Sequence, residues 1–253
     1  MNEKITFSDL KKIAANSDLL LELSFPTRSP EYAATILREL EEIGVNGVYL
    51  VEKPSFSRLM ILGKGYRGIV VRGAMRNLDV AVKILRTDSP LASLFREAEA
   101  TKLANEVGVG PRLLGYSSHV LVLEFIDGVS IGDWLENLEY AEVDLLKNVL
   151  RKCFHQAKAL DEVGLDHGEL SDARKHIIVK RDLNPVIIDF GKSGLRKKPS
   201  NVTSLFSYLT YGPQSEKTLS MLEVSEPPIN EVKEYKRRMD SESFEKLLQA
   251  LNL

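Results

Sequence analysis

The segment 62–70, LGKGYRGIV, has the glycine spacing of a loop that covers a phosphate chain. Its glycines, between two β-rich runs, are Gly63, Gly65 and Gly68. Backbone without side chains can approach the phosphates of a nucleotide closely, which is the chemistry such a loop supplies. A dinucleotide-binding Rossmann turn needs a helix after its glycines, and here a strand-like run follows instead. A glycine-rich hairpin without a ligand is the alternative for this segment taken alone.

A lysine and a glutamate downstream of the glycines are suited to fixing a nucleotide. Lys83 lies in the strand-like run 80–85, where alternation places it on one face with Ala81. From there its ammonium group can reach phosphates as a point charge, whereas a solvent-facing lysine on an edge strand is the alternative. Glu97 follows in a helical pattern and can pair with Lys83. Glu99 is the rival position, because the helical phase does not choose between the two.

The second half of the chain carries two short motifs that place carboxylates beside apolar runs. The motif HGELS at 167–171 precedes the run IIV at 177–179, and the motif DFG at 189–191 follows the run VII at 186–188. Carboxylates can orient or deprotonate a hydroxyl group and can hold a divalent cation. The motifs follow the glycine loop, the strand lysine and the helical glutamate in one order, which favours a common site over coincidence.

The elements that must position these residues are predicted from periodicity and turn residues. Short β-rich runs predict five strands of an antiparallel meander. Their ranges are 59–62, 68–72, 78–85, 113–116 and 120–125. Apolar residues at spacings of three and four predict a core helix over 142–162. Ser8 is the expected cap of a first helix, and two more helices are expected to open at Pro30 and Pro90.

In this order the motifs resemble those of the protein-kinase superfamily, from residue 58 to about residue 215. The His-Gly-Glu loop is similar to the His-Gly-Asp loop of the atypical RIO kinases and of the archaeal KEOPS-associated kinase. The resemblance implies an α+β, bilobal kinase-like fold. Residues 51–126 are expected to form an N-lobe with a five-stranded antiparallel sheet, and 127–253 a reduced, mainly helical C-lobe. Residues 1–50 are expected to be a helical extension or a small module.

The resemblance also implies a role for each candidate site residue. Lys83 and Glu97 would position ATP, and Asp189 would bind the Mg²⁺ or Mn²⁺ that bridges its phosphates. Glu169 would orient the acceptor hydroxyl group. Val70 and Ala81 would cover the adenine ring, and backbone groups near Glu124 and Ile126, in a hinge between the lobes, would pair with its edge. The full set of implied nucleotide contacts is Gly63, Gly65, Gly68, Val70, Ala81, Lys83, Glu97, Glu124 and Ile126.

The catalytic loop departs from the family pattern at two positions. Glu169 stands where the family has aspartate, and the extra methylene shifts the carboxylate by more than catalysis readily tolerates, so slow transfer is expected. The family's asparagine corresponds to Arg174 when counted forward, and to His176 when counted back from the run 177–179. His176 is therefore a candidate metal ligand, and imidazole favours Mn²⁺ over Mg²⁺. A surface or packing role is the alternative for His176.

We therefore expect an atypical, ATP- and metal-dependent Ser/Thr protein kinase that also phosphorylates itself. One alternative is a nucleotide-binding pseudokinase that acts as a regulatory scaffold, which the altered loop favours. Another is a small-molecule phosphotransferase, against which the short C-terminal region counts because it lacks large helical insertions. No Ala-Pro-Glu element follows the DFG motif, as is typical of the RIO-like group.

Composition and net charge limit which partners and which cellular compartment are expected. The 253 residues carry a net charge of -2, which gives no ground for a nucleic acid as the obligate partner. No apolar stretch is long enough to predict a membrane span, and no signal sequence is apparent. The single cysteine, Cys153, has no partner for an intramolecular disulfide. These features predict a cytoplasmic protein, a monomer or weak oligomer, that acts on an unidentified protein substrate.

Overall fold

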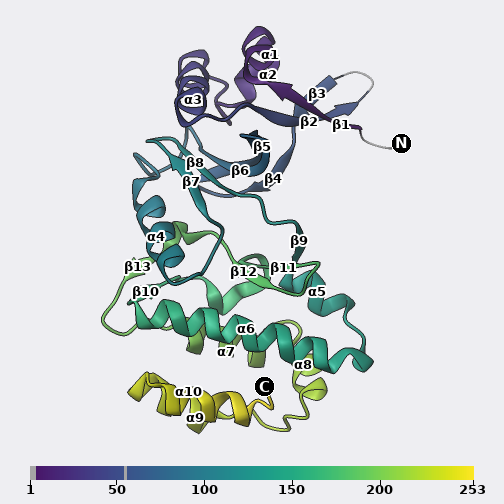
Figure 1. The fold of residues 1–253 in the computed structure, drawn as a ribbon, viewed down its shortest axis with the longest axis vertical. Helices are drawn as coiled ribbons and strands as arrows, with labels where there is room; N and C mark the ends of the chain where they lie inside the picture. Colours follow the sequence, from purple (N-terminus) through teal and green to yellow (C-terminus); the bar gives the residue numbers. More distant parts are fainter. Residues whose placement is uncertain (1–3, 54–55) are drawn as a thin grey trace. The chain divides into compact units, whose positions relative to one another are not determined.

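The computed structural model describes residues 4–53 and 56–253 (Figure 1). Within the described residues the chain forms two compact units. Unit 1 consists of Met1–Glu99 and Arg112–Phe125, and unit 2 consists of Ala100–Pro111 and Ile126–Leu253. The expected α+β class is confirmed, because an antiparallel sheet dominates the N-terminal part of the chain and helices dominate the C-terminal part. Within the described ranges, no helix combines the length and apolarity that a membrane crossing requires.

Unit 1 is built on an antiparallel sheet of eight strands, where five were expected. The strand order is β1-β2-β5-β6-β8-β7, with β3 paired to β2 and β4 paired to β5. The bounds are β1 (Lys4–Asp9), β2 (Gly47–Lys53), β3 (Phe56–Leu59), β4 (Ile61–Lys64), β5 (Gly68–Met75), β6 (Leu78–Leu85), β7 (Leu113–Tyr116) and β8 (Val120–Glu124). Four of the five expected strands are present as β5, β6, β7 and β8, whereas the expected run 59–62 is divided between the end of β3 and the start of β4, with Met60 in neither. The number was too low because of this division and because β1 and β2 belong to the same sheet.

The first strand replaces the helix start that was expected at Ser8. Ser8 lies within β1, and Asp9 caps the following helix by accepting a hydrogen bond from the Lys12 backbone N–H at 2.9 Å. Phe7 lies directly across from Tyr49 of β2, and the two rings pack edge to face. Such cross-strand aromatic pairs stabilise a sheet. The contact therefore favours a strand paired with β2 over a helix for this segment.

Three helices of unit 1 come from the first 50 residues: α1 (Leu10–Ala15), α2 (Ser17–Glu22) and α3 (Pro30–Ile43). The Ser29 hydroxyl caps α3 by accepting from the Tyr32 N–H, and Gly44 ends the helix in the left-handed conformation, as those residue types predict. The buried face of α3 carries Ala33, Ile36 and Leu40, which share one hydrophobic core with Val71 and Val82 of the sheet. Residues of the N-terminal segment therefore complete the core of unit 1.

A buried carboxylate joins α3 to the turn between β7 and β8. Glu39 accepts hydrogen bonds from the Ser117 hydroxyl at 2.5 Å, from the His119 backbone N–H at 3.1 Å and from His119 Nδ1 at 2.8 Å. Burial works to raise the pKa of Glu39, but these hydrogen bonds together lower it below its ordinary value. The ionised carboxylate is thus the form that the folded state favours.

Because the pKa of Glu39 is depressed on folding, its contribution to stability is present above the unfolded-state pKa and is lost as the pH falls through the folded-state pKa. We expect Glu39→Gln to lower the free energy of unfolding by about 2 kcal/mol at pH 7. The difference from the unmodified protein should shrink as the pH falls below 4.5, the ordinary pKa of a glutamate side chain. Urea unfolding across this range measures it. Glu41→Gln, an exposed change on the same helix, should show no such trend, and a pH-independent difference for Glu39→Gln would contradict the assignment.

Helix α4 (Phe95–Glu106) crosses the division between the units, so Glu97 belongs to unit 1 and the helix end to unit 2. The helix begins later than expected, because residues 90–94 are irregular and not helical. The Ser89 hydroxyl accepts a hydrogen bond from the Leu91 N–H, and Leu94 is fully buried. A local turn and the burial of one leucine therefore hold this segment out of the helix that Pro90 was expected to open.

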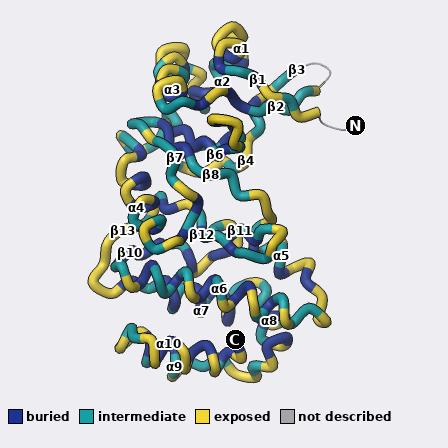
Figure 2. The backbone as a smooth tube through the Cα atoms, in the orientation of Figure 1, coloured by how far each residue is buried: buried dark blue, intermediate teal, exposed yellow. Residues whose placement is uncertain are grey.

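Unit 2 is organised around α6 (Val143–Glu162), which lies almost where the core helix was predicted. All seven of its predicted apolar positions are buried: Leu146, Val149, Leu150, Cys153, Phe154, Ala157 and Leu160. In Figure 2 the tube of α6 alternates between buried segments in dark blue and more accessible ones. The other helices of unit 2 are α5 (Ile131–Asn137), α7 (Asn201–Tyr211), α8 (Ser215–Met221), α9 (Ile229–Arg238) and α10 (Ser241–Ala250).

Short strands and 3₁₀ turns lie between the helices of unit 2. The order β12-β11-β9 forms one small sheet and β10-β13 another. Their bounds are β9 (Gly128–Ser130), β10 (Leu165–Asp166), β11 (Ile177–Lys180), β12 (Pro185–Ile187) and β13 (Gly194–Leu195). The 3₁₀ turns are η1 (Tyr140–Glu142), η2 (Leu170–Lys175) and η3 (Phe190–Lys192). The hairpin of β11 and β12 places the HGE loop before one strand and the DFG motif after the other.

Candidate active-site residues in two units

The strand lysine and the helical glutamate of unit 1 form a buried ion pair. Lys83 Nζ lies 2.6 Å from Glu97 Oε1, and the two side chains are 11% and 4% exposed. Glu99, the rival position, is exposed. Because the pair is shielded from water, each charge depends strongly on the other, and the lysine ammonium is held in one place on the face of β6.

The glycine loop forms the hairpin between β4 and β5, and its glycines have different reasons to be there. A Cβ at Gly68 would lie 2.8 Å from the carbonyl oxygen of Ile84, so close packing against β6 accounts for this glycine. A Cβ at Gly63 would meet nothing within 4 Å, and one at Gly65 would make only an ordinary contact. Packing therefore explains Gly68 but leaves open backbone at Gly63 and Gly65, which is what a loop over phosphates requires.

The other predicted nucleotide contacts lie on or beside the same sheet. Val70 is directly across from Lys83 in the β5–β6 register, and Ala81 lies two residues before Lys83, so all three share one face. Val70 and Ala81 are half-buried. Glu124 ends β8, where its backbone N–H donates to the Arg112 carbonyl at 2.9 Å and its carboxylate pairs with the Arg112 guanidinium. Ile126 is the first residue of the second segment of unit 2.

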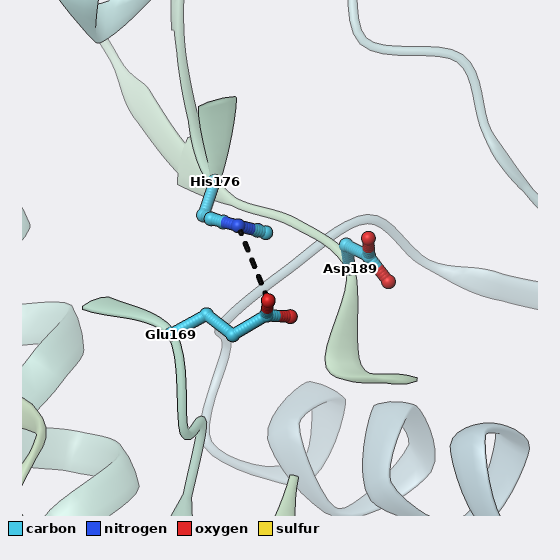
Figure 3. A group of neighbouring side chains, drawn as sticks. All are labelled: Glu169, His176 and Asp189. Carbon is cyan, nitrogen blue, oxygen red and sulfur yellow. Dashed lines mark ion pairs between the residues drawn. The ribbon is translucent and has the colours of Figure 1, made fainter. Parts of the chain in front are cut away.

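In unit 2 the structure brings together Glu169, His176 and Asp189 (Figure 3). Glu169 precedes η2, His176 ends it, and Asp189 follows β12. One ligand atom from each residue lies within 4.8 Å of the other two, and Glu169 Oε1 lies 3.8 Å from His176 Nε2. The backbone N–H of Ile188 donates to the His176 carbonyl at 2.9 Å, which sets the start of the DFG motif beside His176.

This geometry separates the two alignments that the sequence left open. Arg174 is exposed and its guanidinium pairs with Asp172, whereas His176 faces the other two residues of the group. Two carboxylates and one imidazole suit a divalent ion that accepts both oxygen and nitrogen ligands, such as Mn²⁺. Glu169, His176 and Asp189 are therefore the residues that would hold such an ion, which would supply positive charge at this position.

His167 supports the backbone of the DFG motif. It is fully buried, its ring Nε2 lies 3.0 Å from the Ile188 carbonyl oxygen, and its ring packs edge-on against Phe190. Burial lowers the pKa of His167, which favours the neutral ring. A carbonyl accepts only, so Nε2 carries the proton and His167 holds the residue before Asp189 in place.

Asp189 itself adopts an unusual backbone conformation. Its φ of 65° lies in the left-handed region, and its carboxylate accepts a hydrogen bond from the Gly191 N–H at 3.3 Å. For a residue other than glycine this conformation costs about 1 kcal/mol or more, and such strain persists where the surroundings over-determine it. Here the Phe190 ring is buried beside His167 and the backbone of Gly110, which locks the segment.

A buried polar network behind the loop was missed from the sequence. Asn201, at the start of α7, accepts from the His167 N–H at 2.8 Å and donates to Asp161. Asp161 also accepts from the Tyr235 hydroxyl at 3.0 Å. Burial raises the pKa of Asp161, while the hydrogen bonds of Asn201 and Tyr235 oppose that rise. The sequence feature that could have revealed this network is Asp161 itself, because it lies four residues after Ala157 and therefore on the apolar face of the core helix.

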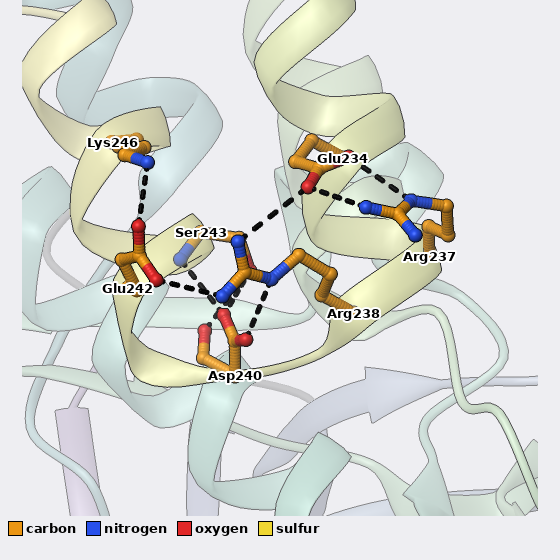
Figure 4. Close-up of polar contacts among 7 residues, drawn as sticks. All are labelled: Glu234, Arg237, Arg238, Asp240, Glu242, Ser243 and Lys246. Carbon is orange, nitrogen blue, oxygen red and sulfur yellow. Dashed lines mark hydrogen bonds and ion pairs between the residues drawn. The ribbon is translucent and has the colours of Figure 1, made fainter.

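A second cluster of charges lies at the turn between α9 and α10 (Figure 4). Arg238 pairs with Asp240 and Glu242 at 2.7 Å each and with Glu234 at 3.7 Å. Asp240 caps α10 by accepting from the Ser243 N–H, and this hydrogen bond is the main cause that lowers the pKa of Asp240 to about 2. The cluster closes a turn between two helices and contains none of the predicted site residues.

Two surface hollows of unit 2 lie on either side of Trp134. Both are lined by Val129, Trp134 and Leu183, and neither includes Glu169 or Asp189.

A comparison with protein-family models finds one match, to the RIO domain, over residues 79–206. The match covers just over half of the chain. It begins in β6 and ends in α7, so it includes Lys83, Glu97 and the HGE and DFG motifs but not the glycine loop. No curated protein matches the chain.

Proposed function

Because the chain belongs to the RIO-domain family, whose members are atypical kinases, we propose that it transfers the terminal phosphoryl group of ATP to serine or threonine residues of a protein, itself included, in a reaction that needs Mg²⁺ or Mn²⁺. The observation that carries this proposal is the Glu169–His176–Asp189 group, which lies inside the matched segment and unites a candidate base with candidate metal ligands. The acceptor class and the metal are parts of the proposal.

Each residue has a task that its surroundings suit. Asp189 and His176 would hold the metal ion, which neutralises negative charge as the phosphoryl group moves. Lys83 would bind the phosphates, and Glu97 keeps its ammonium in place through the 2.6 Å ion pair. Glu169 would accept a hydrogen bond from the acceptor hydroxyl and take its proton. Phosphoryl transfer depends mainly on such positioning and charge neutralisation, so the added methylene of Glu169 slows the reaction without removing its chemistry.

One observation favours a second candidate, a nucleotide-binding pseudokinase. The carboxylate of Glu169 forms an ion pair with Lys192, with Nζ 2.6 Å from Oε1. A carboxylate that remained in this pair during the reaction would be a poor acceptor for a hydroxyl proton. The chain would then bind ATP and a metal without transferring phosphate.

The test is transfer of terminally labelled ATP phosphate to the chain and to a generic protein acceptor, with Mg²⁺ or Mn²⁺. We expect Glu169→Gln to lower the initial rate by about 100-fold or more, because general-base catalysis contributes about that much. Glu169→Asp keeps the carboxylate and restores the family's residue, so its rate should equal or exceed that of the unmodified protein.

Thermal unfolding in the presence of ATP and metal separates the two candidate functions. A ligand at 100 times its Kd stabilises the folded state by about 2.7 kcal/mol, whether or not transfer occurs. Stabilisation without any labelled product, in both the unmodified protein and Glu169→Asp, would refute the kinase proposal and leave the pseudokinase.

A further inference from the structure

A lysine of the protein itself lies at the candidate metal group. Lys192 Nζ is 2.6 Å from Glu169 Oε1, and that same oxygen is the one 3.8 Å from His176 Nε2. The carboxylate side chain is 20% exposed, so it is largely shielded from water. One oxygen is therefore shared between an ammonium group and the residue that we assign as a metal ligand. The group is already a place where a positive charge resides.

The backbone brings Lys192 to this position through a close contact with the catalytic loop. Gly168 has a φ of 83°, and a Cβ there would lie 3.0 Å from the Lys192 carbonyl oxygen. Only glycine fits this approach without strain. Lys192 is also the third residue after Asp189, in the 3₁₀ turn η3. The main chain of Lys192 therefore contacts Gly168, the residue before Glu169, and it follows Asp189 closely in the sequence.

The Lys192 side chain, in contrast, is free to leave. It is 58% exposed, and four rotatable bonds join its ammonium group to the fixed backbone. Water screens an ion pair whose ammonium group is exposed, so a stronger competitor for the carboxylate can replace Lys192. A divalent cation carries twice the charge and binds carboxylate oxygens directly.

From this arrangement we infer that Lys192 and a divalent metal ion are alternative counter-ions of the Glu169 carboxylate. The inference rests on the proposed function and adds a regulation of the same site. In the metal-free protein Lys192 neutralises Glu169. When a metal ion binds beside Asp189 and His176, it takes the place of the ammonium group at the Glu169 carboxylate, and the Lys192 side chain moves into solvent. Metal loading then removes the Lys192 ammonium group from the carboxylate, so the acceptor hydroxyl can approach Glu169 only when the metal is in place.

The direct test is Mn²⁺ binding to the whole chain without nucleotide or acceptor, followed by the electron paramagnetic resonance signal of free Mn²⁺. Lys192→Met removes the competing charge and should lower the Kd for Mn²⁺ about fivefold. Lys197→Met changes the net charge equally at an exposed position of the same segment and should change the Kd less than twofold. Equal effects of the two variants would overturn the inference, as would the absence of any Mn²⁺ binding by the unmodified protein.

A double-mutant comparison shows whether the effect passes through Glu169. In a Glu169→Gln background the carboxylate is gone, so adding Lys192→Met should leave the Kd for Mn²⁺ unchanged. A fivefold gain that persisted in this background would refute competition for Glu169. Because these titrations contain no ATP, their outcome is independent of phosphoryl transfer: an inactive chain can still show the exchange, and an active chain with an unresponsive Lys192 loses only this inference.

Discussion

Lys83→Met is expected to lower both the free energy of unfolding and the rate of phosphoryl transfer. The substitution leaves the Glu97 carboxylate, 4% exposed, without the ammonium group 2.6 Å away. Removing one partner of a buried ion pair costs about 3–5 kcal/mol of stability. Loss of the cation that we propose to bind the phosphates should lower the rate by about 100-fold to 1,000-fold, as for other preorganised electrostatic contacts. Urea unfolding and labelled-phosphate transfer measure the two losses separately.

A paired substitution separates the structural cost from the catalytic one. Lys83→Met with Glu97→Leu replaces the ion pair by apolar side chains, and such replacements are often neutral for stability. We expect this double variant to regain most of the lost stability and to remain inactive. If Lys83→Met alone kept both its stability and its activity, the ion pair would have neither role. If the double variant regained activity with stability, Lys83 would be structural only.

Asp189→Asn is expected to give the largest loss of activity with the smallest change in structure. Asparagine tolerates the left-handed backbone conformation of residue 189 and can still accept the hydrogen bond from the Gly191 N–H. It lacks the negative charge that holds a divalent ion. We therefore expect the rate of labelled-phosphate transfer to fall by about 1,000-fold at saturating metal, with little change in the unfolding midpoint.

Asp182→Asn is the matched control for this change. Asp182 lies in the exposed turn between β11 and β12, so the substitution alters the net charge of unit 2 equally, away from the metal group. Its rate of transfer should stay within about twofold of the unmodified protein. A rate for Asp189→Asn within tenfold of normal would show that Asp189 does not hold the catalytic metal.

Local patterns predicted the elements on which the candidate residues lie, and they did so for a physical reason. Strand alternation placed Lys83 and Ala81 on one face of β6, because successive side chains of a strand point to opposite sides. The three-and-four spacing of α6 predicted its buried face position by position, since the helical period is a property of the local backbone. The family was recognisable for the same reason, because the HGE and DFG motifs are contiguous in the chain.

Contacts between distant segments were beyond such patterns. The pairing of β1 with β2 joins Lys4 to Glu52, and nothing in the local run 4–9 states which strand it will meet. Asp161 was missed because its partners, Asn201 and Tyr235, lie 40 and 74 residues away. A carboxylate on the apolar face of a helix is stable only when it has such hydrogen-bond partners. Whether they lie within reach depends on how α7 and α9 pack.

The proposed chemistry follows from the sequence alone, whereas the residues that we propose for it follow from burial and distances in the folded chain. Residue types and their order indicated a lysine, a metal-binding aspartate and a replaced catalytic carboxylate. Only the folded chain chose Glu97 over Glu99 and His176 over Arg174, because burial and distance distinguish positions that periodicity leaves equivalent. The ion pair of Glu169 with Lys192 spans 23 residues and depends on the contact of Gly168 with the Lys192 backbone, so it exists only once the loops have packed.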